Sequence, residues 1–446
     1  MQTTRRGFIT VAAIGSLVPL LPGCTLTPRR ARRTKGEPLR LACIGTANRA
    51  WDNIQEVRHE RIVALCDVDA GYLARASSEF PEARTFRDFR ELLAMERELD
   101  LDGVVVSTPD HTHALATALA LQAGLPVYCE KPLTRTVREL GVLRTLWERQ
   151  PVATQMGTQI HAGENYRRVV EAIRAGAIGR VTAVDGWQQK SWGDGRLTPG
   201  AVPPAGLDWE LWQGPIERRA YIDGVHPANW RRYWSYGSGT LGDMGCHIMD
   251  LPFWALGLDR AGARSIEVRA EGPPPDAIGA PAWLEASWAF APGRAGDDPL
   301  VLRWFDGGRV SPFVQEIGAK DRVDYHGRFS VCFQGTEGAL FANYGEMLLW
   351  PGARAQAWQP PAPTIAPSIG HHREWLQAIR DGQPTAPLCG IPYATRLTEL
   401  VLLGTVAHRA GRAIQYVPGS MRIDGDPAAD RLLGDAAQPG WTLPRA

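Results

Sequence analysis

The chain has 446 residues, more than one hydrophobic core usually organises, so we expect two domains. Hydrophobic residues form 44% of it and charged residues 22%, which is ordinary for a soluble globular protein. The formal net charge of +1 creates no overall field that would hold nucleic acid, so no nucleic-acid partner is expected.

The first residues are typical of a bacterial export signal. Arg5 and Arg6 form a twin-arginine pair, and an apolar run follows from Phe8 to Leu21, too short to span a bilayer comfortably. The run ends at Leu-Pro-Gly-Cys, which resembles a lipoprotein processing site with Cys24 as the acylated residue. The sequence therefore predicts a signal over 1–24, export to the periplasm by the twin-arginine route and a lipid anchor at Cys24.

The rest of the chain divides into a linker, two domains and a tail. Five basic residues between 29 and 35 predict a solvated basic linker over 25–37; such runs can also bind phosphates or anionic lipid, but less often. The expected segments are a dinucleotide-binding domain over 38–152, a second domain over 153–420 and a C-terminal tail over 421–446.

Apolar segments and helical stretches alternate in the first domain. Strands are expected at 39–44, 61–66, 102–106 and 126–129, and helices at 69–80, 88–98, 113–123 and 134–150. This alternation predicts a doubly wound parallel sheet, which binds ligands beyond the carboxyl ends of its strands. The residues expected at those ends are Gly45, Asp67, Thr108 and Lys131.

The turn after the first strand, Gly45-Thr46-Ala47-Asn48-Arg49-Ala50, partly matches the Gly-x-Gly-x-x-Gly/Ala pattern of dinucleotide-binding folds. Ala47 replaces the glycine that lets the backbone approach a pyrophosphate. Asp67, 22 residues after Gly45, is placed to accept hydrogen bonds from ribose hydroxyls and to repel a 2′-phosphate. This favours NAD over NADP, although Arg49 would soften the preference. A Rossmann-like sheet without cofactor is the alternative.

Three residues carry the predicted chemistry. Asp243 and His247 are four residues apart, so a helix places both on one face, and such a pair suits general acid–base catalysis. Gly242 and Gly245 would leave room for a flat ligand against that face. Lys131, in the Glu-Lys-Pro turn after the fourth strand, is placed to stabilise a developing alkoxide. The structural alternatives are a helix N-terminus with a core histidine, and a surface lysine before a proline.

In the second domain, a strand over 152–160 is expected to leave the first domain, and Gln159 and His161 at its end are candidates to face the substrate. Alternating segments between 265 and 342, separated by tight turns, predict a mainly antiparallel sheet. Six tryptophans lie between 187 and 234. Packing is the commoner role of such residues, and Trp230 is the first candidate to cover a sugar ring.

Six cysteines follow Cys24, and none has metal-ligand spacing, so we predict no metal site. We interpret all six as small core residues, although an oxidising compartment could pair some of them.

Four motifs resemble those of the glucose–fructose oxidoreductase / inositol dehydrogenase / MocA-like (Gfo/Idh/MocA) family, and the similarity covers nearly everything after residue 37. They are Thr-Pro-Asp-His-Thr-His at 108–113, Tyr-Cys-Glu-Lys-Pro at 128–132, Thr-Gln-Met-Gly-Thr-Gln at 154–159 and the segment 239–250. The exported twin-arginine branch is most similar, including the ending Gly-Trp-Thr-Leu at 440–443. The resemblance implies an α/β protein: an N-terminal Rossmann domain plus a C-terminal α+β domain with a large, mainly antiparallel open sheet that often forms the oligomer contact.

By this resemblance Lys131 is the catalytic lysine, and Asp243 and His247 are the second-domain pair, with the histidine as the usual proton-transfer group. Ala47 and Ala50 depart from the family's glycine turn, which concerns cofactor affinity more than the fold. The turn pattern and the resemblance together predict a cofactor site of Gly45, Asn48, Arg49, Asp67, Thr108, Pro109, His113 and Glu130.

The resulting hypothesis is an NAD-dependent oxidoreductase that moves a hydride between nicotinamide and a sugar, polyol or glycoside hydroxyl. His247 takes the hydroxyl proton, Lys131 steadies the oxygen, and Asp243 orients His247 or holds an adjacent hydroxyl. The periplasm is not expected to supply free NAD, so we expect a tightly bound cofactor that is recycled in place. The alternatives are a redox-neutral, NAD-dependent glycoside-cleaving enzyme and a sugar-binding lipoprotein without catalysis.

Overall fold

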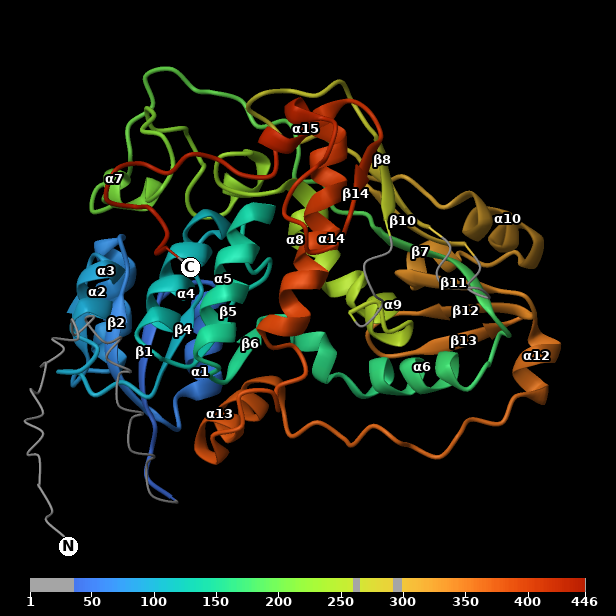
Figure 1. Cartoon of the computed structure of the whole chain (residues 1–446), viewed down its shortest axis with the longest axis horizontal. Helices are drawn as coiled ribbons and strands as arrows, with labels where there is room; N and C mark the ends of the chain where they lie inside the picture. Colours follow the sequence, from blue (N-terminus) through green and yellow to red (C-terminus); the bar gives the residue numbers. More distant parts are fainter. Residues whose placement is uncertain (1–35, 260–264, 292–298, 446) are drawn as a thin grey trace, which may run out of the picture. The chain divides into compact units, whose positions relative to one another are not determined.

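The computed structural model describes residues 36–259, 265–291 and 299–445, and two β-sheets organise these residues (Figure 1). The signal, Cys24 and most of the linker lie outside the described residues. The first sheet has strand order β3-β2-β1-β4-β5-β6, and all its ladders are parallel. Its strands are β1 (Arg40–Ile44), β2 (Arg61–Cys66), β3 (Arg84–Phe86), β4 (Gly103–Val106), β5 (Val127–Cys129) and β6 (Thr154–Met156).

Helices cover both faces of this sheet, which explains why its strands are almost continuously apolar. In β1, Leu41 and Cys43 face one core cluster, whereas Ala42 and Ile44 face the other. The helices are α1 (Arg49–Val57), α2 (Ala70–Glu79), α3 (Phe89–Ala94), α4 (Asp110–Gln122) and α5 (Val137–Arg149), together with α13 (His371–Asp381), which returns from late in the chain. The four predicted strands are confirmed; α1 and β3 are additional elements.

One prediction is wrong in this region. The strand expected to leave the first domain over 152–160 is β6, which is only three residues long and pairs in parallel with β5. The chain then turns into the short 3₁₀ helix η1 (Gln159–Ala162). The first sheet therefore continues to Met156, and the residues that follow it turn back over the end of β5.

The second sheet has strand order β13-β12-β11-β7-β10-β9-β8-β14. Its ladders are antiparallel except for the parallel pair β7 and β10, so the prediction of a mainly antiparallel sheet is confirmed. The strands are β7 (Val181–Gln188), β8 (Ile266–Glu271), β9 (Glu285–Phe290), β10 (Leu300–Asp306), β11 (Val331–Gly335), β12 (Gly338–Ala342), β13 (Met347–Trp350) and β14 (Ile414–Tyr416).

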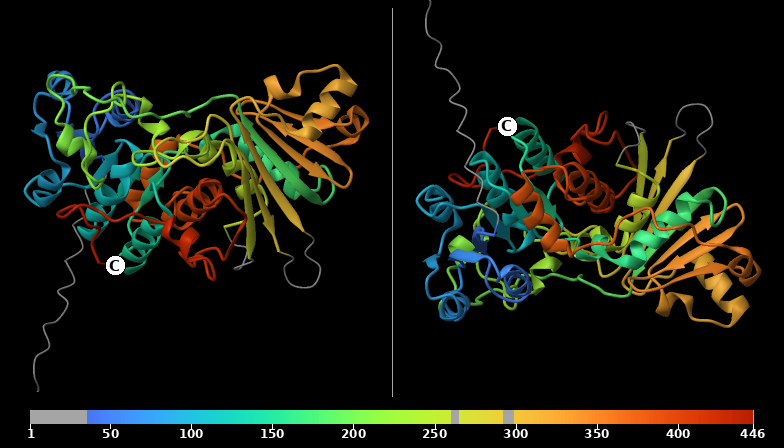
Figure 2. Two further views of the ribbon diagram at one scale, coloured as in Figure 1. Left: turned by 90° about the horizontal axis from the view of Figure 1, so that it is seen from above. Right: turned by 90° about the horizontal axis from the view of Figure 1, so that it is seen from below.

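The two faces of the second sheet are covered differently (Figure 2). The inner face joins the main core through residues such as Val184, Trp288 and Phe333. On the outer face, α10 (Pro312–Asp321) and α11 (Tyr325–Arg328) cover Trp187 and Phe341 with their own apolar side chains. The remaining helices are α6 (Glu164–Arg174), α7 (Trp209–Gln213), α8 (Gly239–Ile248), α9 (Asp250–Ala255), α12 (Gly352–Ala357), α14 (Ile391–Ala410), α15 (Pro427–Arg431) and the 3₁₀ helix η2 (Asn229–Arg232).

The long helix α14 joins the two sheets because it packs against both α5 and α8. Its buried Thr398 hydroxyl lies 3.5 Å from the Leu133 amide, just after the β5 turn, and 3.9 Å from the Cys246 sulfur on α8. The close approach of α8 and α14 depends on small residues, because a Cβ on Gly245 of α8 would lie 2.8 Å from Val401 of α14. This helix therefore fixes the β5 turn relative to α8.

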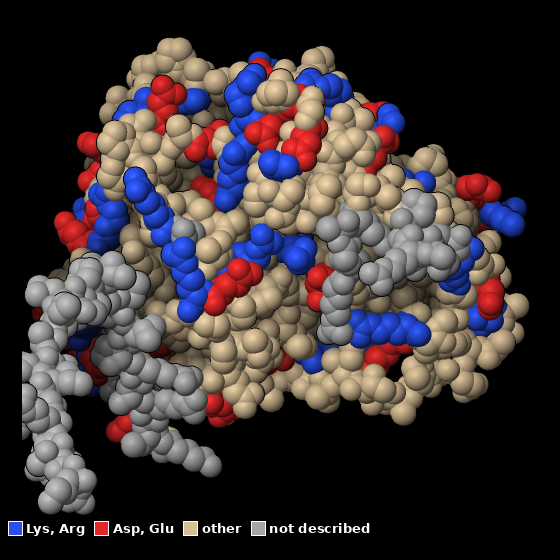
Figure 3. All heavy atoms as spheres, viewed as in Figure 1, with Lys and Arg blue, Asp and Glu red and all other residues tan. Residues whose placement is uncertain are grey.

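One face of the molecule carries both signs of charge, in line with the balanced composition (Figure 3). On the face shown in Figure 3, acidic and basic side chains are interspersed. No helix in the described ranges is both long and apolar enough to cross a bilayer. The six described cysteines are buried and unpaired, in agreement with their interpretation as core residues.

Candidate active site

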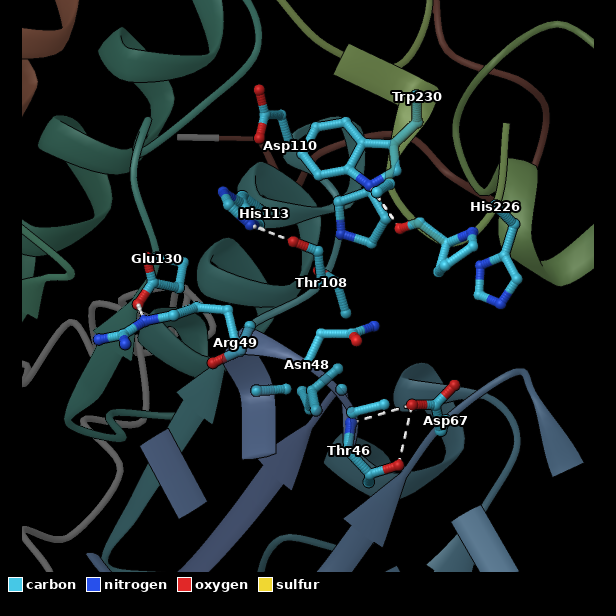
Figure 4. A pocket seen from close by; sticks show the side chains of 18 of the residues that line it. Thr46, Asn48, Arg49, Asp67, Thr108, Asp110, His113, Glu130, His226 and Trp230 are labelled. Carbon is cyan, nitrogen blue, oxygen red and sulfur yellow. Dashed lines mark hydrogen bonds and ion pairs between the residues drawn. The ribbon is translucent and has the colours of Figure 1, made fainter. Parts of the chain in front are cut away.

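A pocket of about 450 Å³ opens where the carboxyl ends of β1, β2, β4 and β5 face α8 and the segment of residues 189–235. Figure 4 shows part of its lining. It brings together residues from both parts of the chain. The predicted site residues that line it are Gly45, Asn48, Arg49, Asp67, Thr108, Pro109, His113, Glu130, Lys131, Gln159, Trp230, Asp243 and His247.

The turn after β1 is held by two features that the sequence anticipates. Gly45 has φ of +90°, and a Cβ there would lie 2.6 Å from the Ser107 carbonyl oxygen, so glycine is required. The Asp67 carboxylate accepts hydrogen bonds from the Thr46 amide and hydroxyl, both at 2.9 Å (Figure 4). It also accepts one from the Asp69 amide at 2.9 Å. Burial raises the pKa of Asp67 despite these hydrogen bonds.

The N-terminus of α1 supplies donors for a phosphate group. Among the described residues the amides of Ala47 and Asn48 have no hydrogen-bond partner, and the Arg49 amide opens the helix, where no earlier carbonyl can pair with it. Asn48 adopts φ of 53° and ψ of −122°, which lies outside the left-handed helical region and is strained for a residue other than glycine. Free amides at a helix N-terminus, with a carboxylate at the next strand end, fit the pyrophosphate and ribose of NAD.

Glu130 organises the wall of the pocket beside β5. Its Oε1 atom accepts from Arg49 Nε at 3.2 Å, Asn53 Nδ2 at 2.9 Å and Gln159 Nε2 at 2.9 Å. Arg49 therefore points toward Glu130 and away from Asp67 (Figure 4). This geometry gives Arg49 no role in weakening the preference of Asp67 for NAD. A Cβ on Gly157 would lie 2.6 Å from the Glu130 carboxyl group, so that glycine makes room for it.

His113 connects the turns after β4 and β5. Its two ring nitrogens lie 2.8 Å from the Pro132 carbonyl oxygen and 2.7 Å from the Thr108 carbonyl oxygen. Two carbonyl acceptors require both nitrogens to donate, which only the imidazolium form can do. Burial alone would lower the pKa of His113, but Cys129 and these hydrogen bonds raise it above the ordinary value.

Lys131 and Asp243 form the central ion pair of the pocket. Lys131 Nζ donates to Asp243 Oδ1 at 2.7 Å and to the Asp243 carbonyl oxygen at 2.6 Å. Asp243 Oδ2 accepts from Lys190 Nζ at 2.8 Å and from Trp192 Nε1 at 2.7 Å, and Arg231 Nε lies 2.9 Å from Oδ1. Burial raises the pKa of Asp243, but the three cations outweigh it and hold that pKa well below its usual range. Asp243 is therefore ionised and occupied by donors.

His247 lies one turn further along α8, as expected, but is not oriented by Asp243. In the described part of the chain the imidazole has no hydrogen-bond partner. Burial, followed by the Lys131 cation, lowers the pKa of His247 to about 3. The neutral ring can therefore accept a proton from a group that enters the pocket.

Two other expectations need correction. Gly245 makes room for Val401 of α14 and not for a flat ligand, and a Cβ on Gly242 would meet Ser238 at 2.4 Å. His161 does not line the pocket: its Nδ1 atom lies 3.0 Å from both Asp250 carboxylate oxygens, and its ring stacks on Trp254 at 4.0 Å. His161 therefore fastens η1 to α9.

Several lining residues were not predicted as site residues, among them Lys190, Arg231 and Asp110. Lys190 and Arg231 belong to the segment 189–235, which has only short helices, so no periodicity directs their side chains. Asp110 stands inside the 108–113 motif, which was the available signal. It is 1% exposed, and its Oδ2 atom has no partner among the described residues. Burial raises the pKa of Asp110 to about 7, against the cations Arg231 and Lys131.

The fold and site are those of a dinucleotide-dependent oxidoreductase. They combine a parallel sheet, a turn with free amides that can bind phosphate, and a pocket that contains a lysine and a histidine. A family model described as "Oxidoreductase family, NAD-binding Rossmann fold" matches residues 39–158. A second one, "Oxidoreductase family, C-terminal alpha/beta domain", matches residues 171–295. Both describe the Gfo/Idh/MocA family and together they cover more than half of the chain, so the chain belongs to this family, with NAD as the cofactor of its first domain.

Several relatives have names that refer to sugars, polyols or glycosides. A "Glycosyl hydrolase family 109 protein" of Stenotrophomonas maltophilia is 34% identical over 194 residues, 40% of each chain. A "Levoglucosan dehydrogenase" of Pseudarthrobacter phenanthrenivorans is 24% identical over 289 residues, 63% of this chain and 64% of that one. The alignments thus span less than two thirds of either relative.

Solved structures share the fold over a longer stretch. The structure of GenD2 from gentamicin A biosynthesis in complex with NAD has a TM-score of 0.57 at 19% identity, and covers 88% of this chain and 99% of that one. At this identity the similarity concerns the fold alone.

Proposed function

We propose that the protein oxidises a hydroxyl group of a sugar, polyol or glycoside with NAD. One observation carries this proposal: Lys131, at the end of β5, and His247, on α8, line the same pocket as the dinucleotide turn. The names of the relatives, which include sugar and polyol dehydrogenases, support the substrate class.

The residues divide the reaction between a base and a charge stabiliser. The neutral His247 imidazole accepts the hydroxyl proton, and the Lys131 ammonium donates a hydrogen bond to the same oxygen. Because its pKa is about 3, His247 alone is a weak base. Proton transfer to it therefore depends on Lys131, which stabilises the negative charge that develops on the substrate oxygen. Asp243 positions Lys131. Bound NAD supplies the hydride acceptor.

The test is a screen of sugars and polyols with the purified protein. Each substrate is assayed once with NAD added and once without added NAD. We expect NADH absorbance with a subset of substrates, and NAD(H) released on denaturation if the cofactor is tightly held. A protein that binds sugars but neither contains nor binds NAD(H) would refute the proposal. That result would favour the sugar-binding alternative.

A second candidate is redox-neutral, NAD-dependent cleavage of a glycoside. The 34% identity to a family 109 glycosyl hydrolase protein favours it. The same base and lysine would serve transient oxidation at one carbon before the glycosidic bond breaks. Free sugar released from a chromogenic glycoside without net NADH would identify this reaction.

Export and anchoring are further proposals that rest on residues 1–24. We propose transport of the folded protein by the twin-arginine route, with NAD loaded before export and recycled afterwards, and acylation at Cys24. Replacing Arg5 and Arg6 with lysine should keep the protein in the cytoplasm, whereas Cys24→Ala should release it from the membrane. Cell fractionation measures both, and unchanged fractions would refute them.

Self-association through the second sheet is also a proposal. The part of the outer face left by α10 and α11 includes β8 and β14, where Glu267 bonds to Arg269 at 2.7 Å and to Gln415 at 2.8 Å. A contact through these polar side chains would weaken in salt. Light scattering at low and high ionic strength should show a homo-oligomer that dissociates, and a salt-independent monomer would oppose the proposal.

A further inference from the structure

The substrate end of the pocket holds more positive than negative charge. Lys131, Lys190 and Arg231 lie 2.7, 2.8 and 2.9 Å from a single carboxylate, that of Asp243. One carboxylate balances one of the three cations. An excess of positive charge therefore remains beside His247, where the substrate hydroxyl is expected.

Neighbouring carboxylates do not cancel this excess. Glu130 is already paired with Arg49 at 3.2 Å. Asp110, which faces Arg231 and Lys131, has a pKa of about 7 because it is buried, so about half of it is neutral near pH 7. The pocket thus suits a ligand that brings an anionic group.

Part of the Arg231 guanidinium group is accessible to a ligand in the pocket. Its Cζ atom lies 4.0 Å from the Trp230 ring centroid, so this indole stacks on it, and 5.8 Å from that of Trp192. Its Nε atom lies 2.9 Å from Asp243 Oδ1, 22% of the side chain is exposed, and no described residue hydrogen-bonds to its terminal nitrogens. A free guanidinium fork binds a carboxylate through two parallel hydrogen bonds.

We propose that the substrate is an acidic sugar whose carboxylate binds to Arg231 and Lys190 while its reacting hydroxyl meets Lys131 and His247. This inference rests on the proposed oxidation for the position of the hydroxyl. Trp230, which lines the pocket, places the edge of its indole beside the anion site, where it can contact the apolar face of a sugar ring. Lys190, with 43% of its side chain exposed, gives the site a solvent-facing entrance.

The experiment compares matched pairs that differ only in the acid group: glucuronate with glucose, and galacturonate with galactose. Glucose 6-phosphate and glucose 6-sulfate serve as additional anions. Calorimetry on the NAD-loaded protein measures binding, and absorbance of NADH measures turnover. We expect the uronates to bind at least about tenfold more tightly than the neutral sugars and the phosphate and sulfate esters less well than the uronates.

Variants assign the preference to the two cations. Arg231→Gln and Lys190→Gln should each lower the acid-to-neutral affinity ratio about ten- to a hundredfold. Arg231→Lys, which keeps the charge but loses the fork, should retain part of the ratio. Arg218→Gln is the matched control: it removes a cation from the same segment outside the pocket and should leave the ratio unchanged.

The outcomes separate this inference from the proposed function. Preferred neutral sugars, a preferred phosphate or sulfate ester, an unchanged ratio in Arg231→Gln and Lys190→Gln, or no binding of any uronate would overturn the inference. Uronates that bind with the expected ratio but yield no NADH would support it and count against the oxidation. Turnover of neutral sugars alone would support the oxidation and overturn the inference of an acidic substrate.

Discussion

The pocket has two walls of different character. The wall formed by the first sheet consists of short turns at strand ends, where buried residues such as His113 and Glu130 have several hydrogen bonds each. The opposite wall includes the long segment 189–235, which has only short helices and contributes Lys190 and Arg231. This contrast indicates that the sheet fixes cofactor and chemistry, while the segment selects the substrate. Changes in the two walls should therefore have different consequences.

The largest effect is expected from Lys131→Ala in the sheet wall. Asp243 keeps Lys190 and Arg231 as partners, so the fold and NAD binding should survive. Loss of the ammonium beside the reacting oxygen should lower kcat about 10²- to 10³-fold. Steady-state kinetics, with the melting temperature and NAD content as controls, measure this. Full activity in a folded variant would remove Lys131 from the mechanism.

His247→Ala should be nearly as damaging, with kcat reduced about 10²-fold or more. The pH dependence gives a second test. The neutral imidazole is the active form, and protonation occurs only as the pH falls through about 3. Activity should therefore show no acid limb from His247 between pH 5 and 7. A limb near 6.5 that disappears in His247→Ala would contradict this assignment.

Gly45→Ala should weaken NAD binding before it affects chemistry. The added Cβ would lie 2.6 Å from the Ser107 carbonyl oxygen at a φ of +90°, and such strain costs about 1–3 kcal/mol. We expect NAD affinity to fall about tenfold or more, measured by titration. Ala47→Gly is the matched control: it restores the glycine of the dinucleotide pattern and should tighten binding or leave it unchanged. Equal affinity in Gly45→Ala would show that the turn does not hold NAD.

Asp110→Asn should remove a pH dependence of the affinity for an anionic sugar. Asp110 becomes ionised as the pH rises through about 7, and its negative charge then offsets Arg231. Affinity for an anionic sugar should therefore fall severalfold above pH 7 in the parent protein and stay level in Asp110→Asn. Neutral sugars should show little change in either. The same pH dependence in both proteins would exclude Asp110 as its source.

The sheet wall could be predicted from sequence because each of its key residues directly follows a recognisable strand. Gly45, Asp67 and Lys131 end apolar segments, and parallel strands bring such ends together. The opposite wall could not be predicted from sequence, because tertiary contacts decide the orientation of side chains in a segment without periodic order. The parallel pairing of β7 with β10 is another long-range feature that no local pattern reveals.

His161 shows the limit of placing a side chain from its position in sequence, and it supplies the smallest predicted effect. It follows Gln159 by two residues, yet η1 turns it into the core, where it contacts Asp250. His161→Leu would leave that buried carboxylate with Tyr393, which donates to it at 2.7 Å, as its main partner. Stability should fall by about 1–3 kcal/mol, with kcat unchanged within about twofold. Thermal unfolding and kinetics on the same sample check this, and a large loss of kcat at unchanged stability would return His161 to the substrate site.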